Sequence, residues 1–443
     1  MSGVSAKKVL VIAYHFPPGG GPGVQRVLKH VTYLRDAGWQ PVVLTVENGD
    51  FPARDESLLA KIPADVRVER VPINEPYTLY RRFMGRKGAA VDVNVNKSSE
   101  QRSGWKEQLS EWIRATFFIP DARIAWLRPA TRRAVELIRE EGISAIYSSS
   151  PPYTCALIGR NTHRAMKLPW VASFRDPWTL FLTTPDRWWL PAWIDRALER
   201  TVFTEATAVE CAWQGIIDDA RGKYPELPVE KFHHVPNGYD ASDFPTIDYT
   251  PNSVFTITYT GSMYGRRTPK ALLEALELLH TQGRLEPPSI KLRLVGRFGD
   301  DVQQMLTAST FAPSIEVIDY VPHQESIAHL MRSEMSLLIV DDAKESAEIV
   351  PGKVYEYLGV GRPILALAPR GSAIETLIHE TKAGVSCPQS DVAGIATAVD
   401  QAVQRWKDGL PIASPLLNEV RKYERRESAA QLARILDHLL ERS

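Results

Sequence analysis

Short apolar runs alternate with amphipathic helical stretches along most of the chain. Runs of this kind cover residues 9–13, 41–46 and 335–340, and residues 255–260 and 290–295 are further predicted strands. Loops and then apolar residues spaced three or four positions apart follow these runs, as in helices that bury one face. Strands buried on both faces of a parallel sheet have such continuous apolar sequences. The pattern therefore predicts an α/β protein built from doubly wound parallel sheets.

The length of 443 residues exceeds what one hydrophobic core usually organises, which favours two domains. We expect a first Rossmann-like domain over residues 1–243 and a second over residues 244–416. Residues 84–106 lose the periodicity and gain Gly, Asn, Ser and charge, so we expect a mobile insertion there. Residues 419–440 are predicted to form one long amphipathic helix, with Asn418 as its cap.

The composition is ordinary for a soluble globular protein, with 44% hydrophobic and 24% charged residues. No apolar run approaches the roughly 18 residues of a membrane-spanning helix, and the first run is too short for a signal peptide. Three widely separated cysteines without a CxxC pair argue against a disulfide framework and against a zinc site. We expect a cytoplasmic protein.

Charge is distributed unevenly, although the formal net charge is zero. Residues 1–240 contain 32 Lys and Arg against 27 Asp and Glu, and the remainder contains 21 against 26. This first half also carries Trp178, Trp188, Trp189 and Trp193 among prolines. Indole rings favour the boundary between water and lipid. The tryptophans therefore indicate either core packing or a surface for a lipid-linked acceptor or a membrane, and the sequence leaves both open.

Residues 345–363 carry the densest candidate chemistry and follow the apolar run 335–340. Glu348 falls in the loop after that run, and Glu356 follows eight positions later, inside a helix that begins at a Pro-Gly pair. Backbone amides at a helix N-terminus favour an anion. Two carboxylates beside such a site fit a phosphorylated ligand with hydroxyl groups at both ends, such as a nucleotide-sugar. The amides that would face outward belong to Val350, Gly352 and Lys353.

Glu348, seven intervening residues, Glu356, and then Gly361-Arg362-Pro363 before a predicted strand form a recognisable signature. It resembles that of retaining GT-B glycosyltransferases of family 4, of the type that serves bacterial polysaccharide biosynthesis. The resemblance implies that Glu348 contacts hydroxyl groups of the donor sugar and that Glu356 contacts the ribose. A solvated acid pair on an ordinary βα unit is the alternative.

The resemblance covers nearly the whole chain, strongly over residues 254–400 and more loosely over residues 50–200. It implies a GT-B fold, in which two Rossmann-like domains face each other across a cleft. In such proteins the last helix crosses back to the first domain, which here corresponds to residues 417–443.

Two loops of the first half are candidates for this cleft. The glycine-rich loop after the first run is similar to the opening of family-4 enzymes, where it closes over the donor phosphates; its glycines are Gly19, Gly20 and Gly21. Arg175 and Asp176 follow the predicted strand ending at 174, where many family-4 enzymes have a histidine. We assign Arg175 to the developing diphosphate charge, and Asp176 either to orienting the acceptor hydroxyl or to acting as a base. An Arg-Asp pair that caps the next helix is the alternative.

Residues 261–270 combine a glycine with several cations after the strand predicted at 255–260. Such a loop before a helix can bind a diphosphate. The family places an Arg directly after this glycine, but Ser262 stands there, so the match is partial. The donor-binding candidates of this half are Gly261, Arg266, Arg267, Lys270 and Gly296, with Arg267 the preferred diphosphate ligand. A solvated basic turn is the alternative.

The resemblance implies a retaining, metal-independent glycosyltransferase without a cofactor. It would move a sugar from a nucleotide-diphosphate-sugar to a glycan or lipid-linked acceptor, in cell-surface polysaccharide or glycolipid assembly. No nucleic-acid partner is expected, and a peripheral contact with the inner face of the cell membrane stays open. The alternatives are a catalytically idle GT-B binding subunit and a nucleotide-sugar 2-epimerase of the same fold. A NAD-dependent dehydrogenase is disfavoured, because no GxGxxG follows either first strand.

Overall fold

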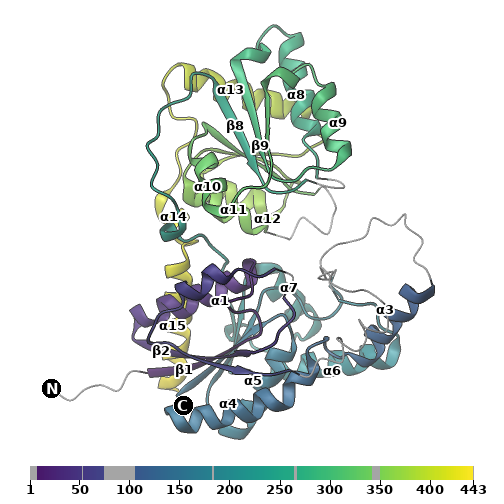
Figure 1. Cartoon of the computed structure of the whole chain (residues 1–443), viewed down its shortest axis with the longest axis vertical. Helices are drawn as coiled ribbons and strands as arrows, with labels where there is room; N and C mark the ends of the chain where they lie inside the picture. Colours follow the sequence, from purple (N-terminus) through teal and green to yellow (C-terminus); the bar gives the residue numbers. More distant parts are fainter. Residues whose placement is uncertain are drawn as a thin grey trace, which may run out of the picture. The chain divides into compact units, whose positions relative to one another are not determined.

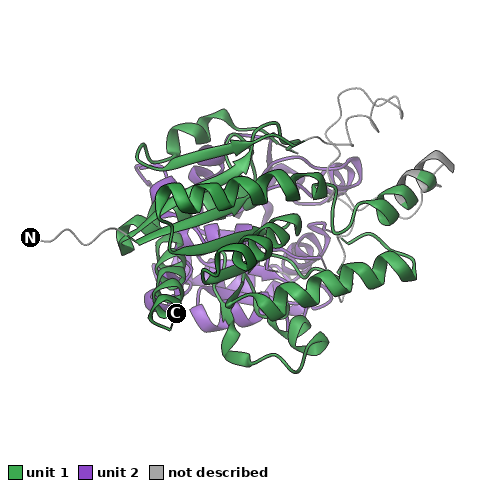
Figure 2. Ribbon diagram, turned by 90° about the horizontal axis from the view of Figure 1, so that it is seen from below, with its two compact units in different colours: residues 1–237, 425–443 green, residues 238–424 purple. Residues whose placement is uncertain are grey.

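The computed structural model describes residues 7–51, 53–73, 105–181, 184–263, 267–341 and 350–442. It contains two compact units: unit 1 comprises residues 1–237 and 425–443, and unit 2 comprises residues 238–424 (Figure 2). The sequence analysis placed these boundaries after residues 243 and 416. The predicted insertion at 84–106 lies outside the described residues, apart from its last two positions, which begin a helix.

Unit 1 is built on a parallel seven-stranded sheet with the order β3-β2-β1-β4-β5-β6-β7. The strands are β1 (Lys7–Ala13), β2 (Trp39–Val46), β3 (Arg67–Val71), β4 (Ala145–Ser150), β5 (Trp170–Phe174), β6 (Ala208–Cys211) and β7 (Phe232–His234). Strand β4 ends in three serines, residues 148–150, which are buried because β1 and β5 pair with this part of the strand.

Helices cover both faces of this sheet, as the continuous apolar strands predicted (Figure 1). Side chains alternate along β1: Leu10 and Ile12 join the core beneath α4 to α7, whereas Val9 and Val11 join the core beneath α1 and α15. The helices are α1 (Pro22–Tyr33), α3 (Trp105–Phe117), α4 (Leu127–Glu141), α5 (Thr154–Met166), α6 (Trp189–Glu205), α7 (Gln214–Lys223) and α15 (Arg425–Glu441).

The predicted single helix over residues 419–440 is wrong. The segment forms α14 (Leu417–Arg421) in unit 2 and α15 in unit 1, and Leu416 rather than Asn418 is the N-cap residue of α14. The helix is interrupted where the carbonyl oxygen of Tyr423 accepts a 3.0 Å hydrogen bond from the amide of Tyr239. The chain passes from one unit to the other at this point. Helix α15 then packs against α1, as the resemblance implied (Figure 1).

Unit 2 repeats the plan with a parallel six-stranded sheet of order β10-β9-β8-β11-β12-β13. The strands are β8 (Phe255–Thr260), β9 (Ile290–Val295), β10 (Ile315–Ile318), β11 (Met335–Ile339), β12 (Ile364–Leu367) and β13 (Gly384–Cys387). Helices α8 (Lys270–Thr281), α9 (Asp300–Ala308) and α13 (Val392–Lys407) cover one face. Helices α10 (His323–Met331), α11 (Gly352–Val360) and α12 (Ala373–Thr381) cover the other. The predicted α/β class with two doubly wound sheets is confirmed.

A buried ion pair anchors α1 to the sheet and to the end of unit 1. The Arg26 guanidinium pairs with Glu210 of β6, and both side chains are completely buried. Its nitrogens also donate hydrogen bonds to the carbonyl oxygens of Val235 (2.8 Å) and Pro236 (3.1 Å) and to Asn237 Oδ1 (3.0 Å). Burial alone would raise the pKa of Glu210, but the Arg26 charge holds it below its usual value.

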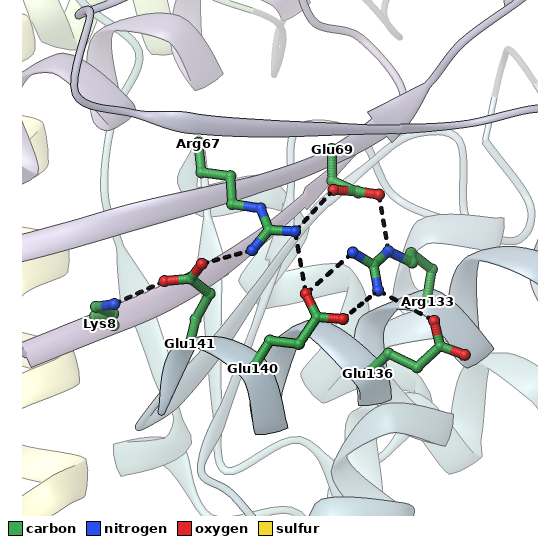
Figure 3. Close-up of polar contacts among 7 residues, drawn as sticks. All are labelled: Lys8, Arg67, Glu69, Arg133, Glu136, Glu140 and Glu141. Carbon is green, nitrogen blue, oxygen red and sulfur yellow. Dashed lines mark hydrogen bonds and ion pairs between the residues drawn. The ribbon is translucent and has the colours of Figure 1, made fainter.

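A surface ion network joins β1, β3 and α4 (Figure 3). Its members are Lys8, Arg67, Glu69, Arg133, Glu136, Glu140 and Glu141. Hydrogen bonds to Glu140 (2.6 Å) and Glu69 (2.8 Å) raise the pKa of Arg133 above its ordinary value. Exposed pairs of this kind contribute little stability. They place charges along the edge strand β3, which discourages pairing with another chain.

We expect Arg26→Met to lower the free energy of unfolding of unit 1 by about 3–5 kcal/mol, because it leaves the Glu210 carboxylate buried without its partner. Arg67→Met in the exposed network is the matched control and should cost less than about 1 kcal/mol. Urea unfolding of both variants measures the difference. Equal losses would contradict this account of the buried pair.

Candidate functional site

In both units the strand order reverses beside the first strand, between β1 and β4 and between β8 and β11. Parallel α/β sheets bind ligands outside the carboxyl ends of their strands at such a point. The loops after these strands are therefore the candidate sites.

Two glycines shape the strand ends of unit 2. Gly261 follows β8 with φ 114°, and Gly296 follows β9 with φ 143°, a backbone region that favours glycine. A Cβ added to Gly296 would lie 2.2 Å from the carbonyl oxygen of Gly261. Both glycines are therefore required for the close approach of the two loops, and contact of either with a ligand stays a prediction.

The side chain of Lys353, in the first turn of α11, lies against the end of β8. Its Nζ donates to Tyr259 Oη at 2.9 Å and to the carbonyl oxygen of Thr260 at 3.0 Å, and lies 4.2 Å from the Tyr259 ring centroid. No ion pair joins it to a carboxylate among the described residues. The sequence analysis assigned only the backbone amide of Lys353. A lysine in a first helical turn opposes the helix dipole, and this signal could have identified the side chain.

The pKa of Lys353 is lowered from 10.5 to about 7, mainly by burial and in part by the charge of Arg267, whereas Glu356 opposes the shift. The ammonium group is therefore only partly charged near neutral pH. An anion bound beside it would favour the charged form. The positive charge of Arg267, the predicted diphosphate ligand, therefore acts on the Lys353 ammonium group.

Glu356, one turn further along α11, lies beside the first residue of α10. His323 Nε2 and Glu356 Oε1 are 2.8 Å apart, and both side chains are partly exposed. His323 is a residue that the sequence analysis did not assign to the site. The structure places this imidazole next to the carboxylate that the resemblance assigned to a ribose.

Helix α11 begins without a side-chain cap and has no acidic residue in its first turn. Its first amides therefore present positive partial charge. Gly352 is exposed, and a Cβ added there would meet nothing within 4 Å. Val350, just before the helix, packs against the core beneath α11. That an anion binds at this helix end stays a prediction.

Three other predicted residues of this half are placed differently or are not described. Lys270 is largely exposed and lies 3.8 Å from Glu274, one turn further along α8. This pairing matches the alternative of a solvated basic turn. Arg266 and Glu348 lie outside the described residues.

In unit 1 the glycine-rich loop is held by its own backbone. The amide of Gly19 donates to the carbonyl oxygen of Phe16 (3.0 Å), and that of Gly20 to the carbonyl oxygen of Ala53 (2.9 Å). These two amides are therefore engaged within the protein. Gly21 has φ 96° and forms the uncapped start of α1. The predicted role of this loop in binding donor phosphates stays a prediction.

Arg175 and Asp176 follow β5 directly. The Arg175 amide donates to the carbonyl oxygen of Ser150 (3.0 Å), and its Nη2 donates to that of Pro151 (2.7 Å). Burial raises the pKa of Asp176, and the Arg175 charge opposes this shift. Neither side chain caps α6, whose N-cap residue is Trp188. Both lie at the carboxyl edge of the sheet, as predicted.

The structure adds two residues to this edge that the sequence analysis missed. His15 follows β1, and Arg123 lies in the loop between α3 and α4. Burial lowers the pKa of His15 to about 3, and the charges of Arg175 and Arg123 contribute to the shift. The imidazole is therefore neutral at physiological pH. An His-Phe-Pro-Pro sequence after an apolar run was the available signal for His15.

The four candidate tryptophans divide into two groups. Trp178 is buried, stacks on Tyr153 at 4.8 Å between ring centroids and donates to Asp195 at 2.9 Å. Its predicted role in acceptor or membrane contact is wrong, because the packed core takes up the whole indole. Trp188, Trp189 and Trp193 are 40%, 75% and 66% exposed.

These exposed tryptophans lie beside α3. Trp188 Nε1 donates to Thr116 Oγ1 at 3.1 Å, and α3 itself exposes further large apolar side chains. Leu109, Trp112, Phe117, Trp188, Trp189 and Trp193 form a surface that we call the aromatic face.

Among the described residues, no three His, Cys, Asp or Glu side chains come together in a way that could hold a metal ion. The described helices include none that is long and apolar enough to cross a membrane.

Comparison with known proteins relates unit 2 to glycosyl transfer. Residues 254–405, about a third of the chain, match the family model described as "Glycosyl transferases group 1". The matched segment runs from β8 into α13 and includes Gly261, Lys353 and Glu356. A comparison with curated protein sequences gives no match.

Solved structures of similar fold cover almost the whole chain. A glycosyltransferase from Rickettsia africae ESF-5 has a TM-score of 0.61 at 13% identity and covers 99% of this chain and 100% of its own. The lipopolysaccharide outer core galactosyltransferase WaaB has a TM-score of 0.54 at 10% identity, with 97% and 99% covered. A candidate UDP-N-acetylglucosamine 2-epimerase from Listeria monocytogenes has 0.55 at 13%, with 99% and 98% covered. At these identities the likeness shows the fold, which is GT-B, as predicted.

We expect the stability of the protein to depend on pH through Lys353. Its pKa is about 7 in the folded state and near 10.5 in the unfolded chain, so the unfolded state binds more protons between these values. Stability contributed by this group therefore rises as pH increases from 7 to about 10. The difference in melting temperature between the wild type and Lys353→Met should grow in favour of the wild type over this range. A difference that stays constant with pH would contradict the lowered pKa.

Proposed function

We propose that the protein transfers a sugar from a nucleotide-diphosphate-sugar to an alcohol group of an acceptor. The observation that carries the proposal is the convergence of Lys353, Arg267 and the uncapped end of α11 at the strand reversal of unit 2. Cations and a helix N-terminus together suit a diphosphate. The segment that holds them matches group 1 glycosyl transferases.

The proposed reaction breaks the bond between the anomeric carbon and the donor diphosphate. Lys353, Arg267 and the first amides of α11 stabilise the negative charge that develops on the leaving diphosphate. Glu348 holds hydroxyl groups of the donor sugar, and Glu356 holds the ribose. His323 orients the Glu356 carboxylate through their 2.8 Å contact.

The acceptor oxygen attacks the anomeric carbon on the face that the leaving group vacates, so the configuration is retained. Its proton passes to an oxygen of the departing diphosphate. Asp176 orients the acceptor hydroxyl. No residue is required as a covalent nucleophile, and no metal ion is required because the cations of unit 2 take the diphosphate charge.

We assign the acceptor side to unit 1 and propose that the aromatic face contacts the membrane in which a lipid-linked acceptor resides. Large exposed apolar patches mark interaction sites, and tryptophan favours the lipid–water boundary. The setting would be the assembly of cell-surface polysaccharide or glycolipid, at the inner face of the cell membrane.

A panel of UDP, GDP, ADP and CMP without added metal tests the donor site. We expect one nucleoside diphosphate to raise the melting temperature, because a ligand that binds only the native state stabilises it.

At pH 8.5 the binding of this nucleotide should take up a proton, because the bound anion favours the charged form of Lys353. Calorimetry in two buffers of different ionisation enthalpy measures this uptake. Lys353→Arg, whose guanidinium stays charged, is the matched control and should bind without proton uptake.

Activity assays separate the alternatives. Glu348→Ala should still bind the nucleotide and lose turnover. Conversion of the donor sugar in the absence of an acceptor would indicate an epimerase instead. The absence of any stabilising nucleotide would point to an idle binding subunit and would contradict the roles of Lys353, Arg267 and Glu356.

The aromatic face is tested with liposomes of anionic phospholipid. We expect Trp189→Ser combined with Trp193→Ser to weaken sedimentation with liposomes by about tenfold or more, because two indoles no longer enter the interface. Leu410→Ser removes an exposed apolar side chain of unit 2 and should have no effect. Unchanged sedimentation of the double variant, or none with the wild type, would rule out this contact.

A further inference from the structure

Arg175 is half-buried, and no carboxylate among the described residues forms an ion pair with it. Its Nη2 bonds to the carbonyl oxygen of Pro151, whereas its Nε is buried and makes no hydrogen bond. Among the described residues no ion pair joins Arg175 to an acid, and Asp176 acts on it only through its electrostatic field. A buried cation in this state is costly. A bound anion would recover that cost.

The group is also held against the start of α1. A Cβ added to Gly23, in the first turn of that helix, would lie 2.1 Å from Arg175 Nη1. Glycine at position 23 is therefore what admits the guanidinium to the helix end. The helix has no side-chain cap and no acidic residue in its first turn, so its positive end is not neutralised locally.

The lowered pKa of His15 indicates a positive electrostatic potential beside Arg175. His15 lies two residues after β1 and is half-buried, and both Arg175 and Arg123 disfavour the charged form of its imidazole. Arg123 is held by a 3.0 Å hydrogen bond from its Nη2 to the carbonyl oxygen of Asp50 and lies 4.8 Å from the Tyr14 ring centroid. The two guanidinium groups thus act electrostatically on the same half-buried neutral imidazole, and Arg175 also lies against the first turn of α1. Asp176 is the acid nearest in sequence.

We propose that Arg175, Arg123 and the first turn of α1 form a second anion-binding site, in unit 1, which holds a phosphate group of the acceptor. The sequence analysis assigned Arg175 to the donor diphosphate, but unit 2 has its own cations and helix end for that group. The assignment of this phosphate to the acceptor rests on the proposed function. The anion site itself rests on the geometry of unit 1 alone.

The loop that carries Arg123 connects this site with the aromatic face. Residues 118–123 continue directly from α3, and Arg187 fixes them by donating to the carbonyl oxygens of Phe118 (3.1 Å) and Pro120 (2.7 Å). Arg187 itself pairs with buried Asp195 of α6 at 3.0 Å. One loop thus joins a cationic site and an apolar surface. A phosphate ester with a long apolar chain matches both.

Calorimetry with inorganic pyrophosphate and geranyl diphosphate, on the full-length protein, tests the site. We expect both to bind, and Gly23→Ala to weaken binding by about tenfold or more, because the new Cβ displaces Arg175 without changing any charge. Gly222→Ala in α7, where a Cβ meets nothing within 4 Å, is the matched control. Arg175→Met should abolish binding, whereas Arg200→Met, an exposed arginine of α6, should not.

A second readout separates an anion site from a general loss of structure. Nuclear magnetic resonance of the histidines, with His15→Gln for assignment, should show the His15 pKa rising by roughly one unit or more when pyrophosphate binds. Gly23→Ala should suppress this rise at the same pyrophosphate concentration. Retained binding in both Gly23→Ala and Arg175→Met, or no binding by the wild type, would overturn the proposal.

The source of the phosphate is decided by repeating the titration with the donor site saturated by the stabilising nucleoside diphosphate. Binding of geranyl diphosphate with unchanged affinity supports an acceptor phosphate. Competition would overturn the assignment to the acceptor and return the site to the donor. If no nucleotide stabilises the protein while pyrophosphate still binds at Arg175, the proposed function fails and the anion site remains.

Discussion

Removing a cation from water costs free energy, and in both units the structure shows whether and how each such cation is compensated. Arg26 is completely buried, and Glu210 together with three backbone and side-chain acceptors compensates its charge, so this pair serves the fold. Lys353 and Arg175 are held by carbonyl oxygens instead, with no carboxylate among the described residues as an ion-pair partner. Burial and the charge of Arg267 lower the pKa of Lys353, and a ligand with negative charge would compensate either group. Uncompensated burial is what distinguishes the candidate sites from the structural ion pair.

Both units place such a cation near the carboxyl ends of their strands, although on different elements: Arg175 follows β5, whereas Lys353 lies in α11, after β11. The first strand lies where the strand order reverses, and the helix end nearest to the cation lacks a cap and an acidic residue. Glycine admits the cation in each case: a Cβ on Gly261 would lie 2.8 Å from Lys353 Nζ, and a Cβ on Gly23 would lie 2.1 Å from Arg175 Nη1. These glycines make room for protein cations rather than directly for a ligand. A ligand bound there would meet a cation whose position is already fixed, and this would reduce the entropy lost on binding.

The tryptophans near α6 of unit 1 divide between the buried core and the exposed surface. Trp178 and Asp195 belong to a buried network in which Arg187 reaches the loop after α3. Burial raises the pKa of Asp195 to about 6, and Arg187 opposes that shift. This network fixes α3 to α6, and the neighbouring tryptophans stay exposed on the outside of the same helices. The buried indole is therefore a support for the aromatic face rather than a part of it.

The sequence by itself determined the α/β class, the two sheets and the loops that carry Gly261, Gly296, Arg175 and α11, because apolar runs and glycine positions are local features of the chain. It misjudged the terminal helix and Trp178, because neither the passage between the units nor the depth of a side chain is visible in local pattern. Only the tertiary structure decided that Lys353 reaches Tyr259, 94 positions away, and that His15 lies in the field of Arg175 and Arg123. Charge states depend on burial and on neighbours from distant segments, so they arise only when the strand ends are brought together.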